Sequence, residues 1–177
     1  ALGYHPMADG IALEGMRLIK EFLPIACKAG NDIDARAHML IASSMGATAF
    51  QKGLGAMHSL SHPCSAVLAT HHGLTNAVVM PYVLIFNRPA IEQKMSALAR
   101  YLNLAKPGFQ AVLDWILQLR QEIGIPHTLQ SLGVKAEHVK RLASMAAIDP
   151  TAATNPIPVT AVELEMLYHK AIVGDID

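Results

Sequence analysis

Residues 58–73 read HSLSHPCSAVLATHHG and contain four of the nine histidines in the chain. His58 and His62 are four residues apart, so on a helix they project from one face about one turn apart. If the segment formed one straight helix, His58 and His72 would lie roughly 21 Å apart, at about 1.5 Å per residue. Pro63 disfavours helical dihedrals at the residue before it, so we expect the helix to bend or stop near His62. The pattern therefore predicts that His72 returns towards His58.

This cluster of imidazoles around a turn is typical of a divalent metal site. Gly73 permits a tight reversal of the backbone, and imidazole nitrogen suits borderline cations such as Fe²⁺ and Zn²⁺. A zinc-protease site requires a glutamate directly after the first histidine as general base, and Ser59 stands there instead. That class of enzyme is excluded. A pair of histidines four residues apart also occurs in helices that bind no metal, and this alternative stays open.

Composition limits the kinds of partner. The 177 residues suit one domain with a substantial core. The net charge is zero and only 16% of residues are charged, which leaves no basic field for nucleic acid or an anionic membrane. The longest apolar run, residues 77–86, is too short to span a membrane. The two cysteines form neither a metal-type pair nor a disulfide framework. We expect a cytoplasmic protein with no nucleic-acid and no membrane partner.

Helical periodicity extends over almost the whole chain, and strand alternation is nowhere sustained. We expect one all-α domain over residues 1–177, with about eight or nine helices. Pro24 should kink or divide the first of them. Thr160 and Glu163 have the spacing of a capping box at the start of the last helix. The main expected helices cover residues 6–28, 34–51, 74–87, 89–103, 108–123 and 135–147.

Several segments together resemble the C-terminal helical domain of the iron-containing alcohol dehydrogenases, which have the dehydroquinate synthase-like fold. The resemblance runs essentially from end to end. Its most specific part is the metal-site signature around His58 and His72. The segments are HPMADGIALEGMRLIKEFLP (5–24), NDIDARAHMLIASSMGATAF (31–50), GLGAMHSLSHP (53–63), THHGLTNAVVMPYV (70–83) and DPTAATNPIPVT (149–160).

The resemblance implies a metal-dependent, NAD(P)-linked oxidoreductase that interconverts a small alcohol and its aldehyde or ketone. It implies that His58 and His72 bind the metal, Fe²⁺ or Zn²⁺. His62 would lie beside the metal and the nicotinamide, as the catalytic and cofactor-facing residue that orients substrate or relays a proton. The other two ligands, an Asp and a His, and the α/β domain that binds most of NAD or NADP would precede residue 1. A homo-oligomer, a dimer or larger, is also implied.

Phe50 departs from the family pattern, and two other interpretations of the histidines remain open. Phe50 stands eight residues before the first ligand histidine, where many relatives have an aromatic residue nine before it, so the resemblance does not support a nicotinamide contact from Phe50. One alternative is a non-catalytic helical module with a three-histidine zinc site made by His58, His62 and His72. Another is a structural fragment whose histidines bind nothing. The high apolar content further predicts an exposed apolar face along residues 74–87 and the site turn.

Overall fold

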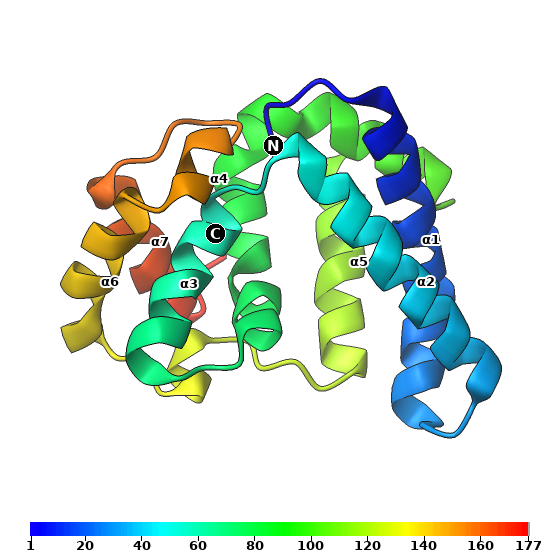
Figure 1. Cartoon of the computed structure of the whole chain (residues 1–177), viewed down its shortest axis with the longest axis horizontal. Helices are drawn as coiled ribbons and strands as arrows, with labels where there is room; N and C mark the ends of the chain where they lie inside the picture. Colours follow the sequence, from blue (N-terminus) through cyan, green and yellow to red (C-terminus); the bar gives the residue numbers. More distant parts are fainter. Residues whose placement is uncertain (177) are drawn as a thin grey trace. The chain divides into compact units, whose positions relative to one another are not determined.

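The computed structural model describes residues 1–176 and contains α-helices and short 3-10 helices, with no strand among these residues (Figure 1). The all-α prediction is confirmed. The described residues form seven α-helices, fewer than the eight or nine expected. These are α1 (Pro6–Lys28), α2 (Ile33–Ala49), α3 (Ala56–Leu68), α4 (His72–Tyr101), α5 (Phe109–Glu122), α6 (Val139–Ala147) and α7 (Ala161–Val173). The 3-10 helices are Phe50–Lys52, Leu129–Leu132, Ala136–His138 and Pro150–Thr154.

The count differs because prolines that should end helices lie inside them. Residues 74–87 and 89–103 were expected as two helices, but α4 runs through both Pro81 and Pro89 as one helix of 30 residues. An internal proline costs a helix about 3 kcal/mol. Pro81 is fully buried, and its packing offsets that cost. Helix α1 likewise continues through Pro24.

The described chain divides into two compact units. The first comprises residues 1–2, 53–90 and those from 125 onward, and so contains α3, the first part of α4, α6 and α7. Its core joins apolar side chains from all four helices, among them Leu60, Val78 and Leu142. The fully buried Tyr168 donates a 2.6 Å hydrogen bond from its hydroxyl to the carbonyl of Leu60. This bond ties α7 to α3, the helix that contains His58.

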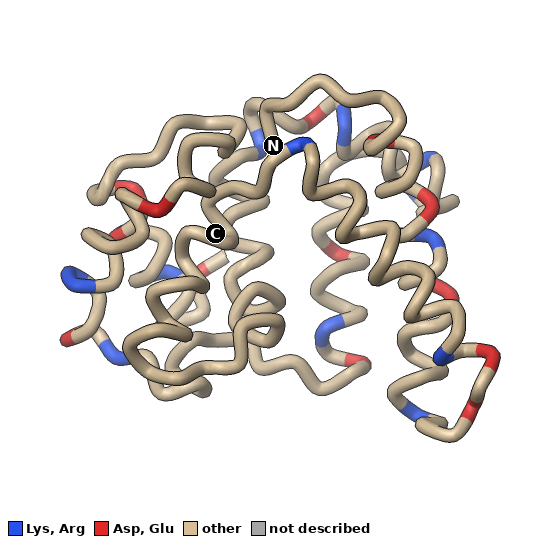
Figure 2. Tube along the Cα trace, in the orientation of Figure 1, with Lys and Arg blue, Asp and Glu red and all other residues tan. Residues whose placement is uncertain are grey.

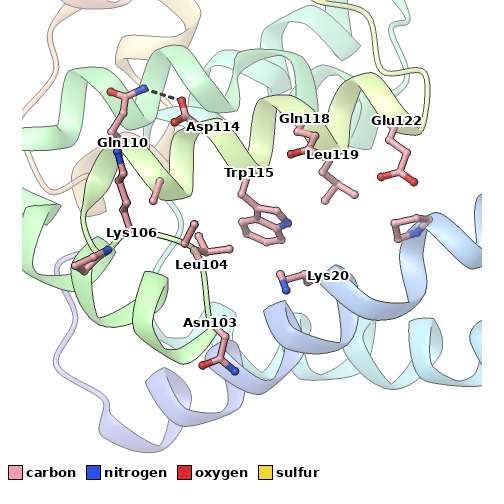
Figure 3. A pocket seen from close by; sticks show the side chains of 14 residues that line it. Lys20, Asn103, Leu104, Lys106, Gln110, Asp114, Trp115, Gln118, Leu119 and Glu122 are labelled. Carbon is pink, nitrogen blue, oxygen red and sulfur yellow. Dashed lines mark hydrogen bonds between the residues drawn. The ribbon is translucent and has the colours of Figure 1, made fainter.

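The second unit comprises residues 3–52 and 91–124. Helices α1 and α2 form an antiparallel hairpin, and the Asp32 side chain caps α2 by accepting a 2.9 Å bond from the amide of Ala35. A cavity of about 740 Å³ is lined by α1, α5 and the loop between α4 and α5. Trp115 of α5 and Lys20 of α1 project into it from opposite walls (Figure 3). No residue of the histidine cluster lines this cavity.

The exposed apolar surface lies on a different helix from the one expected. The large apolar side chains of residues 74–87 are buried or half-buried, because Val78, Val79 and Tyr82 pack into the core of the first unit. Helix α2 instead exposes Ile33, Leu40 and Ile41, with 76%, 72% and 52% of each residue accessible. Figure 2 shows no charged residue along α2 except near its ends. The prediction of an apolar face along residues 74–87 was therefore wrong.

None of the helices in residues 1–176 combines the length and the hydropathy that crossing a membrane requires.

Candidate metal centre

The chain reverses at residues 69–71, after α3 and not within it. Helix α3 continues through Pro63 to Leu68, so the predicted break near His62 does not occur. Pro63 is itself buried, as are Leu60 and Cys64, and this packing outweighs the lost helical hydrogen bond. Ala69 ends the helix in the left-handed conformation, with φ of 53°.

Helix α4 starts immediately after this reversal, with His72 as its first residue. Gly73 already lies inside the first turn of α4, so it is not the residue at which the chain turns. The amide of Leu74 donates a 3.2 Å bond to Nδ1 of His71, which caps the start of this helix. His71 thus has a structural partner, and the reversal delivers the next residue, His72, to the face of α3.

The three expected site histidines lie together. The ring centroids of His58 and His72 are 5.4 Å apart, those of His58 and His62 are 5.8 Å apart, and those of His62 and His72 are 5.3 Å apart. Two imidazoles on one tetrahedral ion, each about 2 Å from it through nitrogen, place their ring centroids about 5 Å apart. The spacing of His58 and His72 is close to this value, and so is the spacing of each of the other two pairs.

His58 is in the form that can bind a metal. Only 9% of the residue is exposed. Burial lowers the pKa of His58 below its ordinary value, and the neighbouring His72 and His62 lower it further, although Asp149 opposes them. The imidazole is therefore neutral at neutral pH, which is the protonation state that metal coordination requires.

His62 hydrogen-bonds to the carboxylate of Asp149, which stands 87 positions later in the sequence. Its Nδ1 lies 2.8 Å from Oδ2 of Asp149. Burial favours the protonated form of Asp149, but hydrogen bonds from Thr151 and His62 outweigh it and hold the pKa of this carboxyl below its usual range. An ionised carboxylate only accepts, so Nδ1 of His62 donates. Nε2, the other ring nitrogen, is left for a substrate or a proton.

Asp149 is in turn fixed by its own loop. Its Oδ1 accepts a 2.8 Å bond from the amide of Thr151 and a 2.6 Å bond from the Thr151 hydroxyl. The same residue caps the 3-10 helix Pro150–Thr154. Thr151 therefore fixes the orientation of the Asp149 carboxylate that hydrogen-bonds to His62. The sequence predicted only a loop here, and its one signal was that DPTAATNPIPVT resembles the family's closing loop.

A buried amide pair fixes the start of α3. Oδ1 of Asn155 accepts from the amide of Ala56 at 3.1 Å and from Nδ2 of Asn87 at 3.0 Å. Nδ2 of Asn155 donates to Oδ1 of Asn87 at 2.8 Å and to the carbonyl of Ile157 at 2.7 Å. Ala56 is the first residue of α3, so this network sets the helix two residues before His58. Sequence reasoning missed both asparagines.

Within residues 1–176, no three His, Cys, Asp or Glu side chains are placed to hold one ion together. The three rings adjoin, but three of their six nitrogens face other partners. Nδ1 of His62 faces Asp149, and the two nitrogens of His72 face Ser61 and Asn76. This geometry gives no support to the three-histidine zinc module.

The chain thus apposes two histidines, His58 of α3 and His72 of α4, across a helix–turn–helix corner. Comparison with known proteins then places it in a family. The sequence profile described as "Fe-containing alcohol dehydrogenase family, C-terminal" matches residues 2–172. The chain belongs to this family, and it matches the C-terminal part.

Individual relatives agree with that assignment. The chain is 34% identical to 4-hydroxybutyrate dehydrogenase of Cupriavidus necator, over 97% of this chain and 47% of that protein. It is 32% identical to NAD-dependent methanol dehydrogenase of Bacillus methanolicus, with the same two shares. The crystal structure of a 1,3-propanediol oxidoreductase superposes with a TM-score of 0.90 at 29% identity, over 95% of this chain and 46% of that one. The chain thus spans about half the length of the relatives it matches.

Proposed function

We propose that this chain is the helical half of an NAD(P)-dependent alcohol dehydrogenase, in which His58 and His72 bind a divalent ion, Fe²⁺ or Zn²⁺. The observation that carries the proposal is the 5.4 Å separation of these two rings in a member of the Fe-containing alcohol dehydrogenase family. The remaining ligands and most of the nucleotide site would come from an α/β domain that precedes residue 1.

The donor set fits such an ion. Both residues are imidazoles, which suit iron and zinc alike, and the pKa of His58 is lowered by its burial, so it presents a neutral ring. When bound, the ion supplies Lewis acidity to the substrate oxygen and the nicotinamide supplies the hydride acceptor. The two relatives above are named as dehydrogenases of 4-hydroxybutyrate and of methanol. We propose a small alcohol and its aldehyde or ketone as the substrate pair of this enzyme.

The residues of this chain then have separate roles. His58 and His72 hold the ion from two helices, while His62 lies beside them with Nδ1 donating to Asp149. That bond fixes the plane of the His62 ring and leaves Nε2 to orient the substrate hydroxyl or take its proton. We propose His62 as the catalytic and nicotinamide-facing residue on this basis. A cytoplasmic homo-oligomer, a dimer or larger, completes the proposal.

Two substitutions in the complete enzyme test these roles. His72→Ala should abolish metal retention, because it removes half of the ligands that this chain contributes. His62→Ala should retain the metal and lose turnover, because its ring is placed beside the ion by Asp149 and is not itself a ligand. Elemental analysis of the purified variants, together with their rates of alcohol oxidation, measures both effects. Equal metal loss in the two variants would refute the division of roles.

A further inference from the structure

Both ring nitrogens of His72 have a hydrogen-bond partner within this chain. Nδ1 lies 3.4 Å from the hydroxyl oxygen of Ser61, and Nε2 lies 2.9 Å from Nδ2 of Asn76. Ser61 is fully buried on α3. Asn76 is one turn after His72 on α4. These two contacts decide which nitrogen of His72 bears the proton.

The Ser61 hydroxyl has a single proton, and of its two neighbours only the His58 carbonyl is always an acceptor. Ser61 donates this proton to the carbonyl of His58 at 3.1 Å. Its oxygen can then only accept from His72, so Nδ1 of the neutral ring must be the protonated nitrogen. Nε2 consequently has the lone pair, and the Asn76 amide donates to it. All three contacts are satisfied by this one arrangement.

The opposite tautomer fails at two places. It needs the Asn76 amide rotated so that its oxygen accepts from Nε2. The buried position that Oδ1 occupies without a partner would then hold an NH₂ group with two donors, which is costlier to leave unpaired than one acceptor. It would also require the Ser61 hydroxyl to rotate towards Nδ1 and so give up its bond to the carbonyl of His58. The geometry therefore selects the Nδ1–H form.

We propose that Ser61 is a positioning residue that fixes His72 in the Nδ1–H tautomer, so that Nε2 is the atom that binds the metal. In the metal-free chain the Asn76 amide donates a hydrogen bond to Nε2, and this hydrogen bond breaks when the ion binds. Histidine ligands are ordinarily oriented through their second nitrogen by a carboxylate, a carbonyl or a water; here a buried hydroxyl does so. The metal-binding part of this inference rests on the proposed function, whereas the tautomer does not.

Helix α3 provides a matched control for Ser61. Ser59 is equally buried, and its hydroxyl donates to the carbonyl three residues earlier, Ala56, at the same 3.1 Å. Replacing either serine by alanine removes one hydroxyl and one hydrogen bond to the helix backbone. Only Ser61 contacts His72. Any difference between the two variants thus reports on the histidine and not on helix stability.

The experiment measures the tautomer directly in the metal-free 177-residue chain. Two-bond ¹H–¹⁵N correlation spectra of ¹⁵N-histidine-labelled protein, at a pH of about 8 where free histidine is neutral, distinguish the two forms. His72→Gln assigns the resonance. We expect the Nδ1–H form in the wild type and in Ser59→Ala, and a shift towards the Nε2–H form in Ser61→Ala. An Nε2–H wild type, or the same change in both serine variants, would overturn the proposal.

Titration with Zn²⁺ alone supplies the second measurement. Ser61→Ala should bind about 10-fold more weakly than Ser59→Ala, in the range that outer-shell substitutions cause. Equal affinities of the two variants would refute the link between tautomer and metal. If the wild-type chain binds no Zn²⁺ at any concentration, the metal-binding part of this inference is refuted for the chain alone, while the proposed function is tested in the complete enzyme. The tautomer spectra then still decide the role of Ser61.

Discussion

Single residues decide the chemistry of this site, and several of them act through a neighbour. His62 is oriented by Asp149, which stands 87 positions later in the sequence, and Asp149 is itself held by Thr151. His72 is oriented by Ser61 from the facing helix. Nδ1 of His62 donates to Asp149, and we propose that Nδ1 of His72 donates to Ser61, with Nε2 of His72 facing Asn76 in this chain. The orientation of the histidines therefore depends on their partners as much as on their spacing along the helix.

The hydrogen bond between Asp149 and His62 should make the free energy of unfolding depend on pH in the acid range. The pKa of Asp149 is lower in the folded chain than its ordinary value. Its contribution is therefore complete above the unfolded pKa of about 4 and is lost as the pH falls through the lower folded value. We expect Asp149→Asn to melt below the wild type at neutral pH, and the gap to narrow in acid below about pH 4. Thermal melts over this pH range measure it, and a gap independent of pH would contradict the assignment.

At the scale of the element, the features predicted correctly were local ones. The capping box of Thr160 and Glu163 needs only residues three apart, and it is present: the amide of Thr160 donates to the Glu163 carboxylate at 2.8 Å, and the Thr160 hydroxyl accepts from Val162 at 3.2 Å. The break expected at Pro63 does not occur, because burial of the surrounding side chains is a tertiary effect that no local rule contains. The bonds of Asp149 and Asn155 join residues 87 and 99 positions apart, so spacing could not reveal them.

Removing the N-cap hydroxyl of α7 should lower the free energy of unfolding by the amount that such losses usually cost. Thr160→Ala should destabilise the chain by about 1 kcal/mol, as losses of N-cap hydroxyls do. For a chain of this length that corresponds to a fall of about 2–4 °C in the melting temperature. Ser144→Ala is the control: this exposed hydroxyl bonds to the carbonyl of Lys140 inside α6 and caps nothing. Melting curves that fall equally for both variants would contradict the capping role.

The amide pair that starts α3 should be more costly to disrupt than a cap. Asn155→Ala leaves the amide of Ala56 and both polar atoms of Asn87 without their partner in the core. Buried groups left unsatisfied cost about 1–3 kcal/mol each, so we expect a loss of at least about 2 kcal/mol in the free energy of unfolding. Chemical denaturation measures it. If Asn155→Ala and Asn87→Ala had additive effects in the double variant, the two side chains would not act as one unit.

At the scale of the whole molecule, the composition of the sequence did not predict how the chain divides or which of its surfaces is apolar and exposed. Periodicity predicted an all-helical chain, and the family resemblance predicted its fold, because both depend on patterns that the sequence itself contains. The division into two compact units was not predicted, since α4 contributes to both of them without any break in its helical pattern. A high apolar fraction indicated an exposed apolar face but not its position. Burial is decided by which helices pack together, and residues 74–87 fill the core of the first unit.

The exposed face of α2 should make the isolated chain associate. From Ala37 to Gln51 the sequence has no Asp, Glu, Lys or Arg, and Leu40 and Ile41 border a hollow shared with α1. Surfaces of this kind on a monomer mark interaction or aggregation sites. We expect the wild-type chain to bind a hydrophobic dye and to sediment faster as its concentration rises.

Polar substitutions locate the cause of that association. Changing Leu40 and Ile41 together to serine should reduce both dye binding and association, because it divides the uncharged exposed face of α2. Ile148→Ser is the control, since Ile148 is 84% exposed in the first unit but lies outside this face. A wild type that remains a monomer at every concentration and binds no dye would show that α2 does not associate. An equal effect of Ile148→Ser would show instead that total exposed apolar area, and not this helix, drives association.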